Sequence, residues 1–192
     1  MGDAATGDAG LQQVELISEL LSYEVRNRLR LLPTGRALRG MDITWVTERI
    51  GLGGGIWNSK NMEEVARSGV THVVNMQLEF DDRPLAEPLG IHVMWNPTDD
   101  DFLPKSVDML KRGVDFALEA LEDPEARIYV HCAAGVHRAP MMTLAILCAL
   151  DWQIEEAMAL VETRRPVVDF ADVYVESVRQ FVASRIESKS KP

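Results

Sequence analysis

The sequence has little cysteine and no long apolar stretch. Its 192 residues contain two cysteines, Cys132 and Cys148, too few for the disulfide framework of a small secreted domain. A helix is predicted to separate them, and sixteen helical positions would hold the thiols roughly 24 Å apart, beyond disulfide reach. We therefore expect a reducing, cytoplasmic setting. No apolar run approaches the ~18 residues of a membrane-spanning helix, so no transmembrane segment is expected.

Basic residues are also scarce relative to acidic ones. Lys and Arg number 20 against 30 Asp and Glu, which gives a formal net charge of -10. This balance lacks the basic footprint of a nucleic-acid-binding protein, so no nucleic-acid partner is expected. The first residues have neither a positively charged stretch nor an apolar one, which argues against a secretory signal.

Strand-like and helix-like segments alternate along the chain. Strands are predicted at 43–46, 49–52, 71–76, 91–95 and 128–130. Helices are predicted at 11–32, 60–68, 105–122, 141–150, 154–164 and 172–187. The alternation predicts an α/β fold with a central, mostly parallel sheet flanked by helices. Residues 1–40 are expected to form an N-terminal extension that contains the first helix, and 41–188 the folded domain.

The segment between the last strand and the next helix carries a cysteine and an arginine six positions apart. It reads His131-Cys132-Ala133-Ala134-Gly135-Val136-His137-Arg138. A loop that runs from a strand end into a helix N-terminus turns successive backbone N–H groups toward one point and can hold an anion. Those dipoles favour the thiolate form of Cys132, and Arg138 can bind two phosphate oxygens. The segment thus predicts a nucleophile inside a phosphate site.

This motif resembles the signature of the dual-specificity branch of the protein tyrosine phosphatase superfamily, which is His-Cys, five residues, then Arg. The resemblance implies a dual-specificity phosphatase-like fold, with 41–188 as its catalytic domain. It also implies a two-step reaction through a phosphocysteine on Cys132, without a metal or cofactor. It further implies that Arg138 acts in catalysis. The substrate-binding residues that it implies are His131, Ala133, Ala134, Gly135, Val136 and His137, and His131 would also order the loop by hydrogen bonding.

The family's general acid is an aspartate some thirty residues before the cysteine. Pro97-Thr98-Asp99-Asp100-Asp101 occupies that place, and Asp100 lies 32 positions before Cys132. We assign the role to Asp100, with Asp99 and Asp101 as alternatives. Such an acid is needed because the leaving alkoxide or phenoxide requires a proton. We call residues 97–104 the acidic loop.

The sequence departs from the family pattern at two positions. Ala139 stands where the family usually has Ser or Thr, whose hydroxyl helps to expel the thiolate, so slower catalysis is implied. The Arg-Ala-Pro ending is similar to that of phosphatases of regenerating liver and plant glucan phosphatases. Those subfamilies usually have Gly at the position of His137. The His137 side chain could contact the substrate phosphate, raise the local positive potential, or simply be an exposed loop residue. Arg164-Arg165-Pro166 resembles a family helix terminus and is explained by the helix dipole.

The leading prediction is a phosphomonoester hydrolase that acts on a protein phosphorylated on tyrosine, serine or threonine, or on a phosphorylated glucan. The small neutral side chains of Ala133, Ala134 and Val136 make an inositol lipid less favoured. The alternative is a catalytically weak, phosphate-binding regulatory module, which Ala139 favours. A rhodanese-like sulfur carrier also uses a cysteine loop, but the cysteine-to-arginine spacing and the upstream acid fit it poorly.

Overall fold

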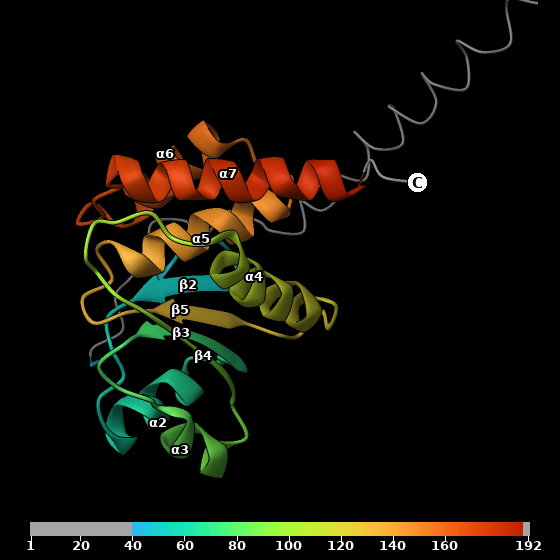
Figure 1. Cartoon of the computed structure of the whole chain (residues 1–192). Helices are drawn as coiled ribbons and strands as arrows, with labels where there is room; N and C mark the ends of the chain where they lie inside the picture. The colour runs from blue at the N-terminus through green and yellow to red at the C-terminus, as the bar shows by residue number, and fades with distance from the viewer. Residues whose placement is uncertain (1–39, 190–192) are drawn as a thin grey trace, which may run out of the picture.

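A five-stranded sheet lies between two layers of helices. The computed structural model describes residues 40–189, and Figure 1 shows helices above and below the sheet. The strand order is β1-β2-β5-β3-β4. β1 pairs antiparallel with β2, and the other neighbours are parallel. The strands are β1 (Ile43–Trp45), β2 (Ile50–Gly53), β3 (His72–Gln77), β4 (His92–Thr98) and β5 (Ile128–His131).

β5 is the central strand, and all four of its residues are buried. In the register of the sheet, His131 at its end pairs with Gly53 of β2 and with Asn75 of β3. The carboxyl ends of parallel strands open at one edge of a sheet, which is where such folds build their sites. The segments that follow β2, β3, β4 and β5 therefore meet at a single edge.

Four helices cover one face of the sheet: α4 (Val107–Leu121), α5 (Arg138–Ala149), α6 (Ile154–Arg164) and α7 (Asp172–Lys189). α5 is almost entirely apolar and is buried from its first residue to Leu147, because α4, α6 and α7 all pack against it. Its side chains form the centre of the larger core. The first residue of α5 is held in place by this packing, together with the loop that leads into it.

The opposite face carries α2 (Ser59–Arg67), α3 (Arg83–Ala86) and the short 3-10 helix η1 (Glu87–Leu89). A smaller core lies beneath them and includes Met62, Val65 and Tyr129. The side chain of Asn58 caps α2 by accepting a hydrogen bond from the Asn61 N–H at 3.0 Å, which stabilises the start of the helix. Across residues 40–189, no helix combines the length and apolar character needed to cross a lipid bilayer.

The α/β architecture with a mostly parallel sheet is confirmed. Most boundaries agree with the sequence prediction to within two residues, and two differ by three: α5 begins at Arg138 rather than at residue 141, and β4 extends to Thr98, two residues into the predicted acidic loop. α3 and η1 were not predicted, because residues 83–89 are too few to show a helical period. The predicted helix at 11–32 lies outside the described residues, as does the N-terminal extension apart from Gly40.

Candidate active site

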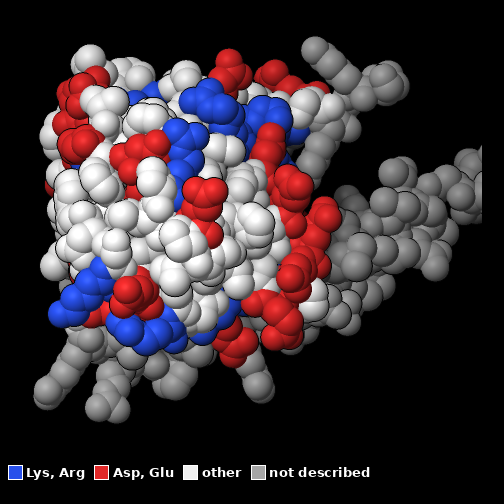
Figure 2. All heavy atoms as spheres, turned by 90° about the horizontal axis from the view of Figure 1, so that it is seen from below, with Lys and Arg blue, Asp and Glu red and all other residues white. Residues whose placement is uncertain are grey.

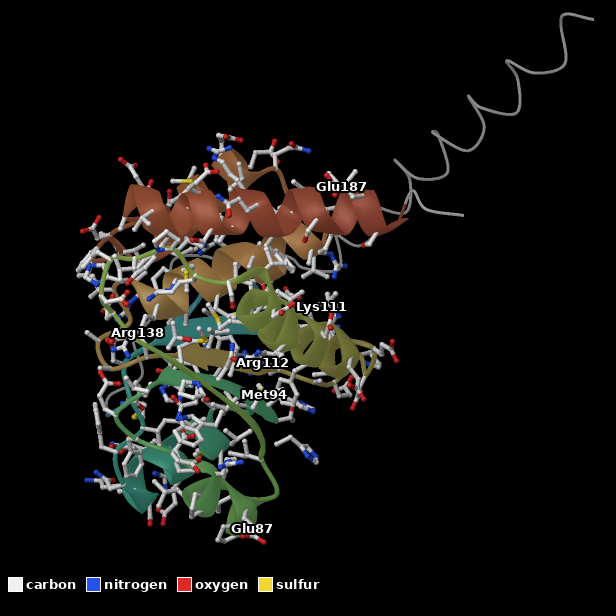
Figure 3. The ribbon with its side chains drawn as sticks, in the orientation of Figure 1. Glu87, Met94, Lys111, Arg112, Arg138 and Glu187 are labelled. Carbon is white, nitrogen blue, oxygen red and sulfur yellow. The ribbon has the colours of Figure 1, made fainter. Side chains whose placement is uncertain are left out.

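Residues 131–138, which we call the Cys132 loop, connect the carboxyl end of β5 to the start of α5. Figure 3 shows Arg138 at the end of the sheet toward which β5 runs. The segments after β2, β3 and β4 surround the loop at this edge, and so does Asp42, which precedes β1. The Cys132 loop and the acidic loop, which are separated in sequence, are thus brought together.

The carbonyl groups of the Cys132 loop are held by groups outside it. The Ala133 carbonyl accepts from the Gly55 N–H at 3.0 Å, and the Val136 carbonyl from the Asp169 N–H at 3.0 Å. Arg165 donates to the two carbonyls between them, those of residues 134 and 135, at 3.1 and 2.9 Å. In a trans peptide the C=O and the following N–H point in opposite directions. Four outward carbonyls therefore turn the N–H groups of residues 134–137 toward the inside of the loop.

Cys132 lies at the base of this loop and is buried. Its Sγ accepts a hydrogen bond from the Gly135 N–H at 3.2 Å. Gly135 has a φ of +66°, and a Cβ there would lie 2.5 Å from the carbonyl carbon of Gly53. The loop can close around the sulfur in this way only with glycine at position 135. The described cysteines, Cys132 and Cys148, are both free thiols.

Arg138 is fixed by Glu79, which lies after β3. Its Nη1 and Nη2 donate to the two carboxylate oxygens of Glu79, both at 2.9 Å, and Nη1 also donates to the Thr98 carbonyl at 3.0 Å. Nε has no hydrogen-bond partner within residues 40–189 and lies 3.6 Å from Oδ2 of Asp100. A buried donor without a partner is costly, and this one is available to an anion in the loop.

The charges around Arg138 alter acid–base equilibria. Burial lowers the pKa of Arg138, but the hydrogen bonds to Glu79 and the nearby Cys132 and Asp100 outweigh it and raise the pKa. The same hydrogen bonds lower the pKa of the Glu79 carboxyl. Arg138 is therefore a permanent cation at the mouth of the loop, with Glu79 as its anionic partner.

Of the three consecutive aspartates, Asp100 faces the Cys132 loop. Its Oδ2 lies 3.1 Å from Nδ1 of His137, and its Oδ1 accepts from the Tyr174 hydroxyl at 3.1 Å. Asp101 forms an ion pair with Lys105, and Asp99 is exposed to solvent. The geometry of the acidic loop thus favours Asp100 as the carboxyl group that can reach an anion bound beside Arg138.

His131 is buried behind the loop, and its hydrogen bond goes to Asp82. Nε2 of His131 lies 2.8 Å from Oδ2 of Asp82, and the other oxygen of Asp82 accepts from the Asn75 amide at 2.8 Å. Nδ1 of His131 has no hydrogen-bond partner within the described part of the chain. His131 therefore ties the end of β5 to the segment before α3, through a side chain that the sequence did not identify.

The sequence interpretation missed several residues of this site, among them Glu79, Asp82, Arg165 and Tyr174. Arg165 was explained by the helix dipole, but it is 5% exposed and binds loop carbonyls and the carboxylate of Asp42 instead. Glu79 and Asp82 follow a strand that ends at the site edge, a position where polar residues could have been singled out. Nothing in the sequence marked Tyr174 as a site residue, because its position is that of an ordinary core residue of α7.

Comparisons with known proteins identify similar sequences and similar folds. Residues 55–183 match the family model described as dual specificity phosphatase, catalytic domain. The chain is 31% identical over 121 residues to protein phosphatase Slingshot homolog 3 of Rattus norvegicus, a match that covers 60% of this chain and 17% of the relative. It is 34% identical over 116 residues to dual specificity protein phosphatase 26 of Bos taurus, with 58% and 51% covered. The matched region spans about a sixth of the length of Slingshot homolog 3 and about half of the length of dual specificity protein phosphatase 26.

Solved structures show the same fold. The crystal structure of PTPMT1 aligns with a TM-score of 0.68 at 22% identity, and the alignment covers 78% of this chain and 99% of that one. A mouse putative dual specificity phosphatase complexed with zinc tungstate aligns with a TM-score of 0.65 at 19% identity, over 82% of this chain and 96% of that one. These likenesses concern the arrangement of strands and helices.

Proposed function

The chain belongs to the family of dual specificity phosphatase catalytic domains, and on that premise we propose that it is an active phosphatase with Cys132 as its nucleophile. One observation carries the proposal: Cys132 lies inside a loop whose outward carbonyls turn N–H groups inward, beside Arg138 with its unpartnered Nε. We assign this catalytic unit to residues 41–188.

In the first proposed step the Cys132 thiolate attacks the phosphorus of a phosphomonoester. The S–P bond forms, and the bond between phosphorus and the leaving oxygen breaks. Asp100, protonated at the start, gives its proton to that oxygen. Arg138 and the inward N–H groups stabilise the negative charge on the phosphoryl oxygens throughout.

In the second step a water molecule attacks the phosphocysteine. An O–P bond forms, the S–P bond breaks, and the electron pair returns to the Cys132 sulfur. Asp100, now a carboxylate, accepts the proton from water, and inorganic phosphate leaves. The Gly135 N–H that contacts Sγ at 3.2 Å stabilises the departing thiolate.

A phosphorylated protein segment is the substrate class that we favour. Besides the buried Asp82 behind His131, three carboxylates contact the last two residues of the Cys132 loop: Asp100 and Asp169 lie beside His137, and Glu79 binds Arg138. They would repel further phosphates on an inositol ring, but not neutral or basic residues beside a phosphorylated side chain. On the face shown in Figure 2, basic side chains form small groups interleaved with acidic ones rather than a continuous basic surface.

A phosphorylated glucan is a second candidate, which exposed aromatic surface near the loop supports. Trp57 is 48% exposed and lies against Gly55, whose N–H binds the Ala133 carbonyl. Phe80 lies beside it, with the ring centroids 6.0 Å apart. Flat aromatic faces of this kind can stack on sugar rings.

The proposal is tested by turnover on a phosphotyrosine peptide, a phosphoserine peptide, a phosphoinositide and phosphorylated amylopectin. We expect the wild type to hydrolyse at least one peptide in the presence of a chelator, and Cys132→Ser to hydrolyse none of the four substrates. Turnover by Cys132→Ser would overturn the mechanism. A wild type that binds tungstate but hydrolyses none of the four would instead be the weak phosphate-binding module.

A further inference from the structure

Both carboxylate oxygens of Asp100 are held by side chains that no sequence argument assigned to that task. Tyr174 at the start of α7 contacts Oδ1, and His137 of the Cys132 loop contacts Oδ2, each at 3.1 Å. We propose that His137 and Tyr174 are positioning residues that hold Asp100 in place to protonate the leaving group. The inference rests on the proposed function, because it gives Asp100 the role of general acid.

Tyr174 connects two parts of the acidic loop. Its hydroxyl donates to Asp100 and accepts from the Phe102 N–H at 3.0 Å, and its side chain is 1% exposed. Burial, together with the hydrogen bond to Asp100, raises the pKa of Tyr174 to about 12. The hydroxyl therefore stays protonated near neutral pH and can donate to Asp100 whether the carboxyl group is ionised or not.

Phe102 is wedged between the two positioning residues. Its ring stacks on Tyr174 at 5.8 Å between centroids and meets His137 edge-on at 5.1 Å. Its φ is +55°, a conformation uncommon for a bulky residue, which persists only where surrounding contacts enforce it. Beyond the loop, the Lys105 N–H donates to Ser177 Oγ of α7 at 3.0 Å. α7 thus anchors the acidic loop through Tyr174 and the residue just after the loop through Ser177.

His137 links Asp100 to the Cys132 loop itself. While Nδ1 faces Asp100, Nε2 lies 3.6 Å from Oδ2 of Asp169 in the segment before α7. Arg138 also lies near the Asp100 carboxylate, with Nε 3.6 Å from Oδ2. The hydrogen bond between His137 and Oδ2 of Asp100 therefore fixes the distance between the acid and the loop that carries the sulfur.

The test compares substrates that differ in their need for a proton. Phenyl phosphate has a poor leaving group that requires the acid, whereas a difluorinated umbelliferyl phosphate has an acidic one that scarcely does. We expect Tyr174→Phe and His137→Ala to lower kcat/KM about tenfold on phenyl phosphate, the loss of one hydrogen bond in the transition state. On the umbelliferyl substrate the loss should be under about twofold.

Three further comparisons separate a positioning role from general damage to the protein. His137→Asn keeps a donor near the place of Nδ1 and should recover most of the loss on phenyl phosphate. Tyr129→Phe removes another buried hydroxyl, which is bound to the Gly54 carbonyl at 2.6 Å, and should leave the ratio of the two substrates unchanged. In an Asp100→Asn background, Tyr174→Phe should cost no further activity, because the acid that it positions is gone.

The positioning role would be overturned if Tyr174→Phe and His137→Ala lost equal activity on both substrates, lost none, or turned over faster. Circular dichroism checks that each variant is folded. Full loss in Cys132→Ser alongside any of these results would leave the proposed function standing. Persistent turnover in Cys132→Ser would instead remove the proposed function itself, whatever the other variants do.

Discussion

Ala139 follows Arg138 in the first turn of α5, and its methyl group is fully buried. In the second step of the proposed mechanism negative charge would develop on the Cys132 sulfur, and a hydroxyl at position 139 could stabilise it. The Gly135 N–H and the positive end of α5 still act on the sulfur. Hydrolysis of the phosphocysteine should therefore be slowed rather than prevented.

We predict that this step is at least partly rate-limiting, and that a pre-steady-state burst accompanies a reactive aryl phosphate. Ala139→Ser should raise the steady-state rate and shrink the burst, while the rate of enzyme phosphorylation changes little. Rapid-quench kinetics measure both quantities. A wild type without a burst, together with an Ala139→Ser variant no faster than it, would show that the first step limits the rate.

Gly135 is required for a different, purely steric reason. Gly135→Ala would place a Cβ 2.5 and 2.6 Å from backbone atoms of Gly53, which cannot move aside as a flexible side chain can. Gly90 has nearly the same φ, +67°, with no atom within 4 Å of its Cβ position. We predict a stability loss of about 2–4 kcal/mol for Gly135→Ala and about 1–2 kcal/mol for Gly90→Ala. Urea unfolding measures both, and equal losses would contradict the steric argument.

At the scale of elements, α7 and the acidic loop depend on each other through Tyr174. A phenol loses its proton near pH 10 in an unfolded chain, whereas burial and the Asp100 hydrogen bond raise the pKa of Tyr174 to about 12 in the folded protein. The folded state therefore keeps a proton that the unfolded state releases. The stabilisation is complete below about pH 10 and is lost as the pH rises toward 12.

We predict that the difference in unfolding free energy between wild type and Tyr174→Phe is constant below about pH 9 and shrinks between about pH 10 and 12. Burial also raises the pKa of the Tyr129 hydroxyl and of the Cys148 thiol, but both groups are present in both proteins and cancel in the difference. Urea unfolding over the pH series measures it, and a difference that stays constant to pH 12 would show that Tyr174 ionises as a free phenol does.

At the scale of the whole molecule, the site joins segments from residue 42 to residue 174. Asp42 and Arg165 connect the start of β1 to the end of α6, while Glu79 and Arg138 connect β3 to α5. An anion bound in the Cys132 loop would contact groups that only the folded chain assembles. Such a ligand stabilises the native state by mass action.

We predict that tungstate at about 100 times its dissociation constant adds about 2.7 kcal/mol, which raises the Tm by roughly 5–10 °C. Cys132→Ser should retain most of this shift, because the N–H groups and Arg138 remain. Arg138→Ala should lose it. Differential scanning fluorimetry makes the comparison, and an equal shift in all three proteins would place tungstate outside the loop.

The sequence by itself determined the fold class and the composition of the Cys132 loop. The periodic segments predicted the α/β layers, because the buried face of a strand and that of a helix each require apolar residues at a characteristic spacing. The Cys132 loop could be predicted because its parts are contiguous in sequence and are arranged by local backbone geometry. These parts are a strand end, Cys132, Gly135 and Arg138. The start of α5 was placed too late, since its first turn is buried by the loop rather than marked by an apolar run.

Only the tertiary structure decided which residues surround that loop. Position in the sequence favoured Asp100 and left Asp99 and Asp101 as alternatives. In the structure Asp100 is the one that faces the Cys132 loop, where Tyr174 and His137 bind it. Glu79 and Arg165 reach the loop from segments 59 and 30 residues distant. Such contacts follow from strand order and helix packing, which bring together groups that no local pattern relates.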